Sequence, residues 1–546
     1  MGLVGYANFS GHGEVEKVKR FAQEHRWLLF LGALGLVLRL STLTWGTGVG
    51  AHMGMYHPDE HKLWRSISNF PESYLNNHRF EYGSALQNTI AVALTPVRLA
   101  RWRIYEPWFG DAVTYEQFTI LAFRVVSCLM GAGSIVLTFF LGERLYDRRV
   151  GWLASILLCL SFYHVIFSPI CSVDVPMSFV FLANLFLCAR AFEKKRWKDF
   201  VWLGLATGYM VGMKVYGVFF GIFPVIYLVG SLKSWPLRDL FLKCLVYAGV
   251  TLLTFIVSSP HIVLQFDKFL AFFMEAPELW KPGYAVSLKS MFIGMPTATK
   301  NLLTLPLAIL TGVGLLLSWP GKQHSLFKLW LGIPLYLCLW MLQFKGWIPS
   351  RYLVMIAPVF CLLAAIPFSK LFAAGWRRSA YALAGAAIIW STATTGMAIG
   401  VKLSDTRTQA GEYLAEEFPK GVRLAVASAP ESIDWRWHTW RYPKFDENDY
   451  EVVSILDEPD YVLTTSISLD RVATVFRGKM LDENYHLPAG ELWWLKGEVP
   501  TPDEFRFYEL LLNGSGPYEL LASWESFNRL NFYFPPPEIR IYQRKP

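Results

Sequence analysis

Residues 27–43 read WLLFLGALGLVLRLSTL, a run of apolar side chains interrupted by a single arginine. A helix that crosses a bilayer needs about 20 mostly apolar residues, so this stretch predicts a membrane span. Comparable stretches recur along the chain, and together they predict about eleven transmembrane helices. The predicted spans cover residues 27–43, 121–141, 150–168, 175–192, 200–214, 216–231, 242–259, 301–318, 326–343, 350–368 and 379–400.

The composition agrees with a membrane protein and shows where the membrane part ends. The chain has 546 residues, of which 53% are hydrophobic and 17% are charged. A soluble protein carries about 25% charged residues. The deficit is confined to the first part of the chain, whereas residues 401–546 have an ordinary soluble composition. This shift predicts a separate C-terminal domain.

The basic residues alternate between the two sides of the predicted membrane. The formal net charge is +8, but the lysines and arginines gather in every second loop and form no single stripe. By the positive-inside rule these loops are cytoplasmic, and no nucleic-acid partner is expected. Residues 1–26 are then cytoplasmic, residues 44–119 and 260–300 form long outer loops, and residues 401–546 lie outside. In a bacterium this places the protein in the inner membrane with a periplasmic or extracellular C-terminal domain.

The C-terminal domain is expected to be a small α/β domain. Residues 405–417 carry apolar side chains at nearly helical spacing, which predicts a helix. Residues 422–427, 450–456, 461–465 and 538–542 predict strands. No catalytic motif stands out in this part of the sequence. The fold class predicted for the whole chain is therefore a polytopic α-helical membrane protein with a small C-terminal α/β domain.

The acidic motif HPDEH, residues 57–61, is the first candidate for a catalytic site and lies in the first outer loop. Asp59 and Glu60 could start a helix, because acidic residues suit the first turn. Beside a membrane surface, they could also supply a general base. His57 and His61, four residues apart, would share one face of a helix and are candidates for a divalent metal. No HExxH pattern is present, and interface histidines remain the alternative.

Three more charged residues lie at the predicted outer ends of spans. Asp174 precedes Val175-Pro176, where it could cap a helix or serve the site. Lys214 lies at a tight junction between two spans, and Arg351 lies just before another span. Isolated cations at this depth are costly unless they meet an anion, although long side chains can also reach lipid headgroups. A lipid phosphate held by Lys214 and Arg351 is the more specific hypothesis.

Glycine-rich phosphate loops are absent from the sequence, and neither a Walker pattern nor a GxGxxG follows a strand. Use of a nucleotide sugar or of ATP is therefore unsupported. A sugar donor would have to be reached from the membrane.

The order and sidedness of these motifs resemble a known group over nearly the whole chain. The set comprises the Asp-Glu pair in the first outer loop, Asp174 at the fourth span, Lys214 before an aromatic residue, Arg351-Tyr352, and a tail beginning Asp405-Thr406-Arg407. It resembles the GT-C membrane glycosyltransferases, specifically the superfamily of protein O-mannosyltransferases and bacterial aminoarabinose transferases. The resemblance implies a GT-C fold over residues 27–400 and a polyprenyl-phosphate-linked sugar as donor, transferred with inversion.

Residue roles follow from the resemblance alone. Asp59 would be the general base, Glu60 would position the acceptor or the loop, and Asp174 would orient the sugar or acceptor. Lys214 and Arg351, with Tyr352, would stabilise the phosphate leaving group. The sequence lacks the extracellular repeat domain of eukaryotic protein mannosyltransferases, so the acceptor stays open among protein, lipid and envelope glycan.

Two other classes of protein compete with this interpretation. A secondary transporter or lipid flippase would carry charges near the bilayer midplane, usually with repeat symmetry. Here the informative charges lie at the ends of spans and no internal repeat is visible. An assembly protein without enzymatic activity would leave the paired carboxylates unexplained except as helix caps.

Overall fold

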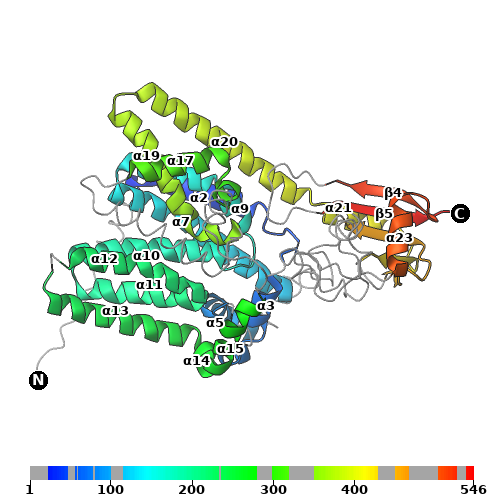
Figure 1. The fold of residues 1–546 in the computed structure, drawn as a ribbon, viewed down its shortest axis with the longest axis horizontal. Coiled ribbons are helices and arrows are strands. Elements are labelled where there is room, and N and C mark those ends of the chain that lie inside the picture. Colours follow the sequence, from blue (N-terminus) through cyan, green and yellow to red (C-terminus); the bar gives the residue numbers. More distant parts are fainter. Residues whose placement is uncertain are drawn as a thin grey trace, which may run out of the picture.

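A helical body and a C-terminal β-sheet make up the molecule (Figure 1). The computed structural model describes residues 23–46, 56–57, 60–77, 80, 82–99, 115–232, 235–279, 298–318, 350–427, 449–465, 502–525 and 537–546. Helix α20 (Arg377–Leu403) runs from the body toward the sheet, and the short helix α21 (Thr406–Glu417) follows it.

The helical body has helical residues in each predicted span that falls on described residues, together with shorter helices. Residues 326–343, one of the predicted spans, lie outside the described part. Besides α20, the body is built from α2 (Arg26–Leu40), α3 (Glu60–Ser68), α4 (Glu72–Leu75), α5 (Ala85–Leu99), α7 (Tyr115–Leu145), α8 (Arg148–Cys159), α9 (Phe162–Phe167), α10 (Asp174–Lys194), α11 (Trp197–Met213), η3 (Val215–Gly221), α12 (Ile222–Ser231), α13 (Leu237–Ser258), α14 (Pro260–Leu264), α15 (Phe266–Leu279), α17 (Leu305–Leu317), η4 (Ser350–Ile356) and α19 (Ala357–Ala373).

Several helices are long and apolar enough to span a bilayer, so the protein is a multi-pass membrane protein. Within the described residues, 5 helices meet this condition by length and composition. The prediction of about eleven spans is not confirmed. One reason is that a predicted span is divided, because residues 150–168 form the two helices α8 and α9.

The break between α8 and α9 is stabilised by polar groups from other helices. The hydroxyl of Thr395 donates to the carbonyl of Leu160 at 2.7 Å, and Arg39 reaches the carbonyl of Leu158 at 3.3 Å. Non-helical backbone at membrane depth persists only where its polar groups find partners within the protein. Hydropathy alone shows no such break, because both halves are apolar.

Arg39 is the arginine in the opening stretch of the sequence, and its side chain is fully buried in the body. Its Nη1 donates to the carbonyl of Gly35 at 2.8 Å, and its Nη2 lies 2.9 Å from Nδ1 of His164. The carbonyl of Leu158, its third partner, stands at the C-terminal end of α8, where the helix dipole favours a cation. Arg39 therefore fastens α2 to α8 and α9.

Glycines allow close crossings between the helices. A Cβ on Gly314 of α17 would lie 1.8 Å from the carbonyl oxygen of Leu363 on α19, whereas one on Gly312 would meet nothing within 4 Å. Small residues at crossings let helix backbones approach, which is the usual source of packing energy inside a membrane. Helix α19 is buried along nearly its whole length, while α13 exposes Leu252, Leu253 and Val257, as a lipid-facing helix would.

The C-terminal part forms a mixed five-stranded sheet with the order β2-β1-β3-β5-β4. Its strands are β1 (Arg423–Val426), β2 (Glu451–Val452), β3 (Tyr461–Thr465), β4 (Tyr518–Trp524) and β5 (Ile539–Arg544). Strand β1 pairs in parallel with β2 and β3, and β5 pairs antiparallel with β3 and β4. The predicted strands 422–427, 461–465 and 538–542 are confirmed, whereas the strand predicted at 450–456 has only two residues.

Helices cover both faces of this sheet. Leu424 and Ile541 pack with Ala410 and Leu414 of α21, and the alternate residue Ala425 packs on the other side. There it meets Tyr508 of α23 (Pro502–Leu512). The side chains of a strand point alternately to its two faces, so each strand serves two small cores. The predicted α/β character is confirmed, although α23 and β4 were not predicted.

Candidate functional site

Helix α20 leads from the helical body toward the sheet (Figure 1), and Glu60 is linked to its end through Arg124, Trp45 and Asp405. Helix α10 begins with Asp174, and α11 ends beside Lys214, so these antiparallel neighbours present both residues at one end. The ends of α2 and α20 meet there too, because Trp45 bonds to Asp405. This convergence follows from the alternating direction of consecutive spans.

Glu60 begins helix α3, and both of its carboxylate oxygens are bound by Arg124 of α7. The guanidinium donates from Nε to Oε1 and from Nη2 to Oε2, each at 2.9 Å, and both side chains are fully buried. Such a two-bond arginine–carboxylate pair fixes geometry as well as charge. Arg124 also donates to the carbonyls of Leu43 at 2.7 Å and Trp45 at 2.8 Å. Glu60 therefore fastens the first outer loop to α7. Asp59, its neighbour, lies outside the described residues.

A short turn joins Glu60 to Asp174. The backbone N–H of Cys171 donates to Oε1 of Glu60 at 2.7 Å. One residue on, the hydroxyl of Ser172 donates to Oδ2 of Asp174 at 2.8 Å. The two predicted acidic positions are thus brought into one hydrogen-bonded group by the segment before α10.

Asp174 forms a buried ion pair with Lys214. The Nζ of Lys214 donates to Oδ1 of Asp174 at 3.0 Å, and the two side chains are only 2% and 6% exposed. The ammonium also lies 5.5 Å from the ring centre of Tyr82. The side chain of Asp174 is therefore engaged by Ser172 and Lys214 and does not cap α10, whose N-cap residue Val173 forms no side-chain cap bond. Helix capping, the alternative for Asp174, is not what the structure has.

Arg351 lies in η4, which packs against α10, and its side chain is half-buried. The side chain of Tyr352 lies outside the described part of the chain. The structure therefore places Arg351 beside the helix that Asp174 begins. The shared phosphate contact stays a prediction.

The histidines of the acidic motif differ in what can be said of them. His57 is buried, and its ring packs edge-on against that of Phe167 with centroids 6.0 Å apart. The side chain of His61 is outside the described set. Within the described residues, no group of three or more His, Cys, Asp or Glu side chains is arranged to hold a metal ion. Metal binding by His57 and His61 stays a hypothesis.

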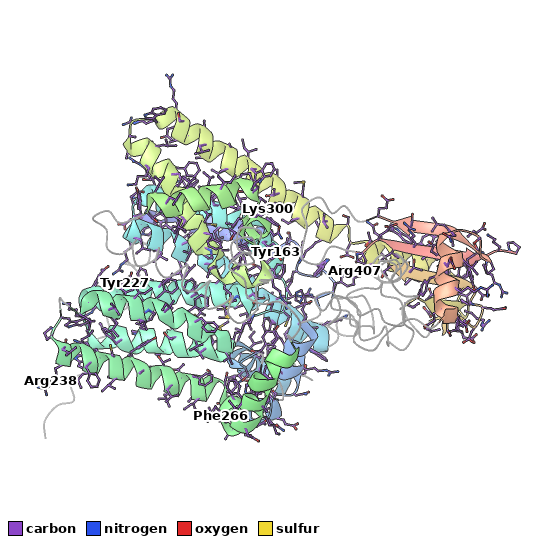
Figure 2. All side chains as sticks on the ribbon, in the orientation of Figure 1. Tyr163, Tyr227, Arg238, Phe266, Lys300 and Arg407 are labelled. Carbon is purple, nitrogen blue, oxygen red and sulfur yellow. The ribbon has the colours of Figure 1, made fainter. Side chains whose placement is uncertain are left out.

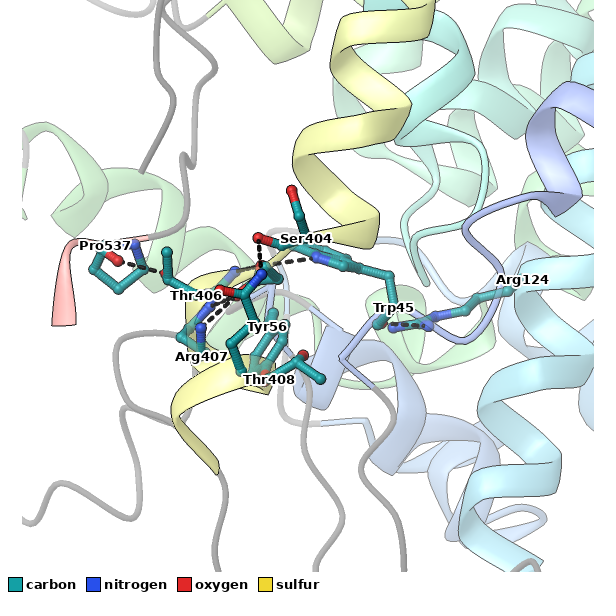
Figure 3. A network of polar contacts seen from close by, with 10 residues as sticks. Trp45, Tyr56, Arg124, Ser404, Thr406, Arg407, Thr408 and Pro537 are labelled. Atoms are coloured by element: carbon teal, nitrogen blue, oxygen red, sulfur yellow. Dashed lines mark hydrogen bonds and ion pairs between the residues drawn. The ribbon is translucent and has the colours of Figure 1, made fainter. Parts of the chain in front are cut away.

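A second polar cluster joins the first outer loop to the start of the C-terminal domain (Figure 3). Asp405 accepts from the indole Nε1 of Trp45 at 2.9 Å and from the Nη2 of Arg407 at 2.6 Å. The Arg407 guanidinium lies 3.8 Å from the ring centre of Tyr56, and the hydroxyls of Tyr56 and Thr408 are 3.2 Å apart. Burial raises the pKa of Tyr56 to about 12, against the opposing effect of Arg407, so the phenol is neutral at physiological pH. Arg407 itself lies between the body and the sheet (Figure 2).

The sequence did not reveal Arg124, Tyr82 or the interaction of Asp405 with Trp45. One signal for Arg124 was available, since a charged residue inside an apolar span is rare and usually has a partner in the protein. The other two contacts join residues far apart in the sequence, and no local pattern announces them.

Part of the chain matches a known protein family. Residues 106–264 match the family model described as "Dolichyl-phosphate-mannose-protein mannosyltransferase", a segment that contains Arg124, Asp174 and Lys214. No curated protein sequence matches the chain.

Solved structures share its fold at low sequence identity. The archaeal oligosaccharyltransferase AglB from Archaeoglobus fulgidus, in complex with an inhibitory peptide and a dolichol-phosphate, is 10% identical with a TM-score of 0.53. The match covers 95% of this chain and 89% of that chain. The oligosaccharyltransferase from the same organism in complex with Zn and sulfate is 13% identical, with a TM-score of 0.50 and coverage of 95% and 88%. ArnT from Cupriavidus metallidurans bound to undecaprenyl phosphate is 14% identical, with a TM-score of 0.48 and coverage of 82% and 95%.

Proposed function

We propose that this chain, which belongs through residues 106–264 to the dolichyl-phosphate-mannose-protein mannosyltransferase family of GT-C glycosyltransferases, is an inverting enzyme that acts at the outer face of its membrane. It transfers a sugar from a polyprenyl-phosphate carrier to an acceptor hydroxyl. The family supplies the donor class, and the AglB structure of related fold also holds a lipid phosphate, dolichol-phosphate.

The reaction exchanges one bond at the anomeric carbon for another. Asp59 takes the proton from the acceptor hydroxyl, and the acceptor oxygen attacks C1 of the sugar. The bond from C1 to the phosphate oxygen breaks on the opposite face, and its electron pair leaves with the polyprenyl phosphate. Attack and departure on opposite faces invert C1. Phosphate leaves readily, so no strong general acid is required, unlike in ordinary glycoside hydrolysis.

The observation that carries this proposal is the buried pair of Lys214 and Asp174 within the segment that the family model matches. One N–H of the Lys214 ammonium donates to Asp174, and an ammonium at this buried position carries the charge that attracts a phosphate oxygen. The Asp174 carboxylate holds the ammonium in place before the donor binds. Lys214, together with Arg351 and Tyr352, then stabilises the charge that develops on the leaving phosphate.

Glu60 is assigned to holding the loop, the second of its two expected roles. Both of its oxygens accept from Arg124, and Oε1 also accepts from the Cys171 N–H. A carboxylate so engaged has its oxygens turned to these donors and is poorly placed to meet an acceptor hydroxyl. The neighbouring Asp59 remains the proposed base, and Asp174 orients the sugar or acceptor.

The site is proposed to open on the periplasmic or outer side of a bacterial inner membrane, the side on which the C-terminal domain lies. The loop charges support this sidedness. The family description names a protein acceptor, so side-chain hydroxyls of proteins are the first acceptors to test, with envelope glycans and lipids next. A divalent metal at His57 and His61 is testable in the same assay by adding a chelator.

The decisive experiment uses purified protein in lipid vesicles with polyprenyl-phosphate mannose and an envelope extract as the acceptor mixture. The wild-type chain should release polyprenyl phosphate, and Asp59→Asn should abolish release while leaving the protein folded. Asp267→Asn, which changes an exposed carboxylate of α15, should release it as the wild type does. Full activity of Asp59→Asn would remove Asp59 as the base. Movement of the donor across the bilayer without release of polyprenyl phosphate would instead identify a flippase.

A further inference from the structure

The segment from Tyr56 to Glu60, called the acidic loop below, is contacted at each end by a buried arginine. Only one of the two arginines belongs to the membrane helices. After the loop, Arg124 of α7 binds Glu60 with two hydrogen bonds of 2.9 Å. Before it, Arg407 of α21 lies against the ring of Tyr56 at 3.8 Å. Tyr56 and Glu60 are both buried, and the backbone N–H of Glu60 donates to the carbonyl of His57 at 3.1 Å.

Trp45 contacts residues at both ends of the acidic loop. Its carbonyl accepts from Nη1 of Arg124 at 2.8 Å, and its indole N–H donates to Asp405 at 2.9 Å. Its ring also packs edge-on against Tyr56, with centroids 5.6 Å apart. The two arginines are thus joined through one residue, which Figure 3 shows between them.

Asp405 fixes Arg407 where it meets Tyr56. Its carboxylate caps α21 by accepting the backbone N–H of Arg407 at 2.9 Å, and it also accepts from Nε at 2.8 Å and Nη2 at 2.6 Å. Arg407 is only 1% exposed, so the guanidinium has little freedom. The hydroxyl of Tyr56 bonds to Thr408 one residue later.

Lys402 ties the end of α20 to the same place. Its ammonium donates to the carbonyl of Ile166 at 2.6 Å and lies 4.0 Å from the ring centre of Trp45. The end of α20, the start of α21 and the beginning of the first outer loop are therefore one buried unit. A shift of the C-terminal domain would displace Tyr56.

We propose that Asp405 and Arg407 are positioning residues for the acidic loop, so that the C-terminal domain sets the place of the catalytic base. The proposal rests on the proposed function, in which Asp59 is that base. The two residues touch neither donor nor acceptor. They act through Tyr56, which lies four residues before Glu60, so both ends of the short segment that contains Asp59 are held.

The test measures kcat and KM for polyprenyl-phosphate mannose in the vesicle assay, together with hydrogen exchange of the peptide that contains residues 56–60. Arg407→Ala should lower kcat by about 10- to 100-fold, because a displacement near 1 Å costs a rate of this order. The KM for the donor should change by less than about 2-fold, since Lys214 and Arg351 are untouched. Exchange in residues 56–60 should rise.

A gentler pair of variants guards against simple unfolding of the C-terminal domain. Tyr56→Phe and Thr408→Val each remove one side of a single hydrogen bond and leave the Tyr56 ring against Arg407. Each should lower kcat by about 2- to 5-fold, and the double variant should be no worse than either alone, because both remove the same interaction. Tyr56→Ala, which also removes the ring, should be as impaired as Arg407→Ala.

Thr406→Val is the matched control. It is the same substitution two residues from Thr408, but the lost bond runs to the carbonyl of Pro537 inside the C-terminal domain. It should leave kcat and the exchange of residues 56–60 unchanged. Unchanged kcat in Arg407→Ala, or a raised donor KM with unchanged kcat, would overturn the inference while the wild type stays active. A wild type that releases no polyprenyl phosphate would instead overturn the proposed function.

Discussion

Two lysines pair with aspartates at opposite ends of the helical body, and their surroundings differ. Lys214 meets Asp174 across two helices where both side chains are buried. Lys243 meets Asp239 one turn away on α13 at 2.5 Å, and there the carboxylate is 39% exposed. An ion pair within one helix at the surface is common, whereas a lysine buried between helices suits a site that binds an anion.

At this scale we expect Lys214→Gln to raise the KM for polyprenyl-phosphate mannose by about 10- to 100-fold, the effect of losing one hydrogen bond to a charged group. Lys243→Gln, at the far end of the body, should leave donor use unchanged. The measurement is release of polyprenyl phosphate as a function of donor concentration. A defect that appears only when acceptor concentration is varied would contradict the phosphate contact.

Sequence analysis could identify candidate site residues where a single charge interrupts an apolar stretch. Asp174 and Lys214 were noticed because charges are rare at span ends, and the structure brings them together. That they bind each other, and that Glu60 is held by Arg124, depends on which helices become neighbours. Their catalytic roles, and those of Asp59, Arg351 and Tyr352, stay predictions.

Among the elements, the crossing of α17 and α19 shows how closely two spans approach. Gly314→Ala would place a methyl group 1.8 Å from the carbonyl oxygen of Leu363, so the helices must move apart. Overpacking of this kind costs about 1–3 kcal/mol. We expect a matching fall in the thermal unfolding midpoint of the detergent-solubilised protein.

Gly312→Ala on the same helix is the control, because its new methyl group meets nothing within 4 Å. Alanine is the better helix former by about 1 kcal/mol, so this variant should be as stable as the wild type or slightly more so. Equal losses in both variants would mean that α17 does not cross α19 at Gly314.

Element positions were predictable where hydropathy changes along the chain, and less so elsewhere. The spans 121–141, 175–192 and 379–400 correspond to α7, α10 and α20. The break between α8 and α9 was missed because Thr395 and Arg39, both distant in sequence, stabilise it. Strand β4 was missed because it has few buried residues, so its alternation is weak.

For the whole molecule, sidedness is the central expectation. All seven cysteines precede residue 400, and most of those described are buried. A new cysteine is therefore distinguishable by a membrane-impermeant maleimide. Glu519→Cys, exposed on β4, should be labelled in intact cells, and Lys194→Cys, exposed at the end of α10, only after the membrane is permeabilised. The reverse result would invert the topology.

The sequence predicts that the chain has two domains, but not how they contact each other. The change in composition near residue 400 announced a second domain, and α20 does end at Leu403. No sequence pattern predicts that this domain is joined to the first outer loop, since Trp45 and Asp405 are separated by 360 residues. A contact at that separation depends on the complete fold.

The partners of Arg39 also set an order of events during synthesis. Helix α2 leaves the ribosome first, yet its guanidinium bonds to Leu158 and His164, the latter 125 residues further along the chain. At roughly 5–20 residues per second, the first span waits about 6–25 seconds for its partner. Until then Arg39, in the last turn of α2, has neither of these two partners. A ribosome-stalled chain that ends before residue 158 should therefore show Arg39 still accessible to water, and a chain long enough to expose α9 should not.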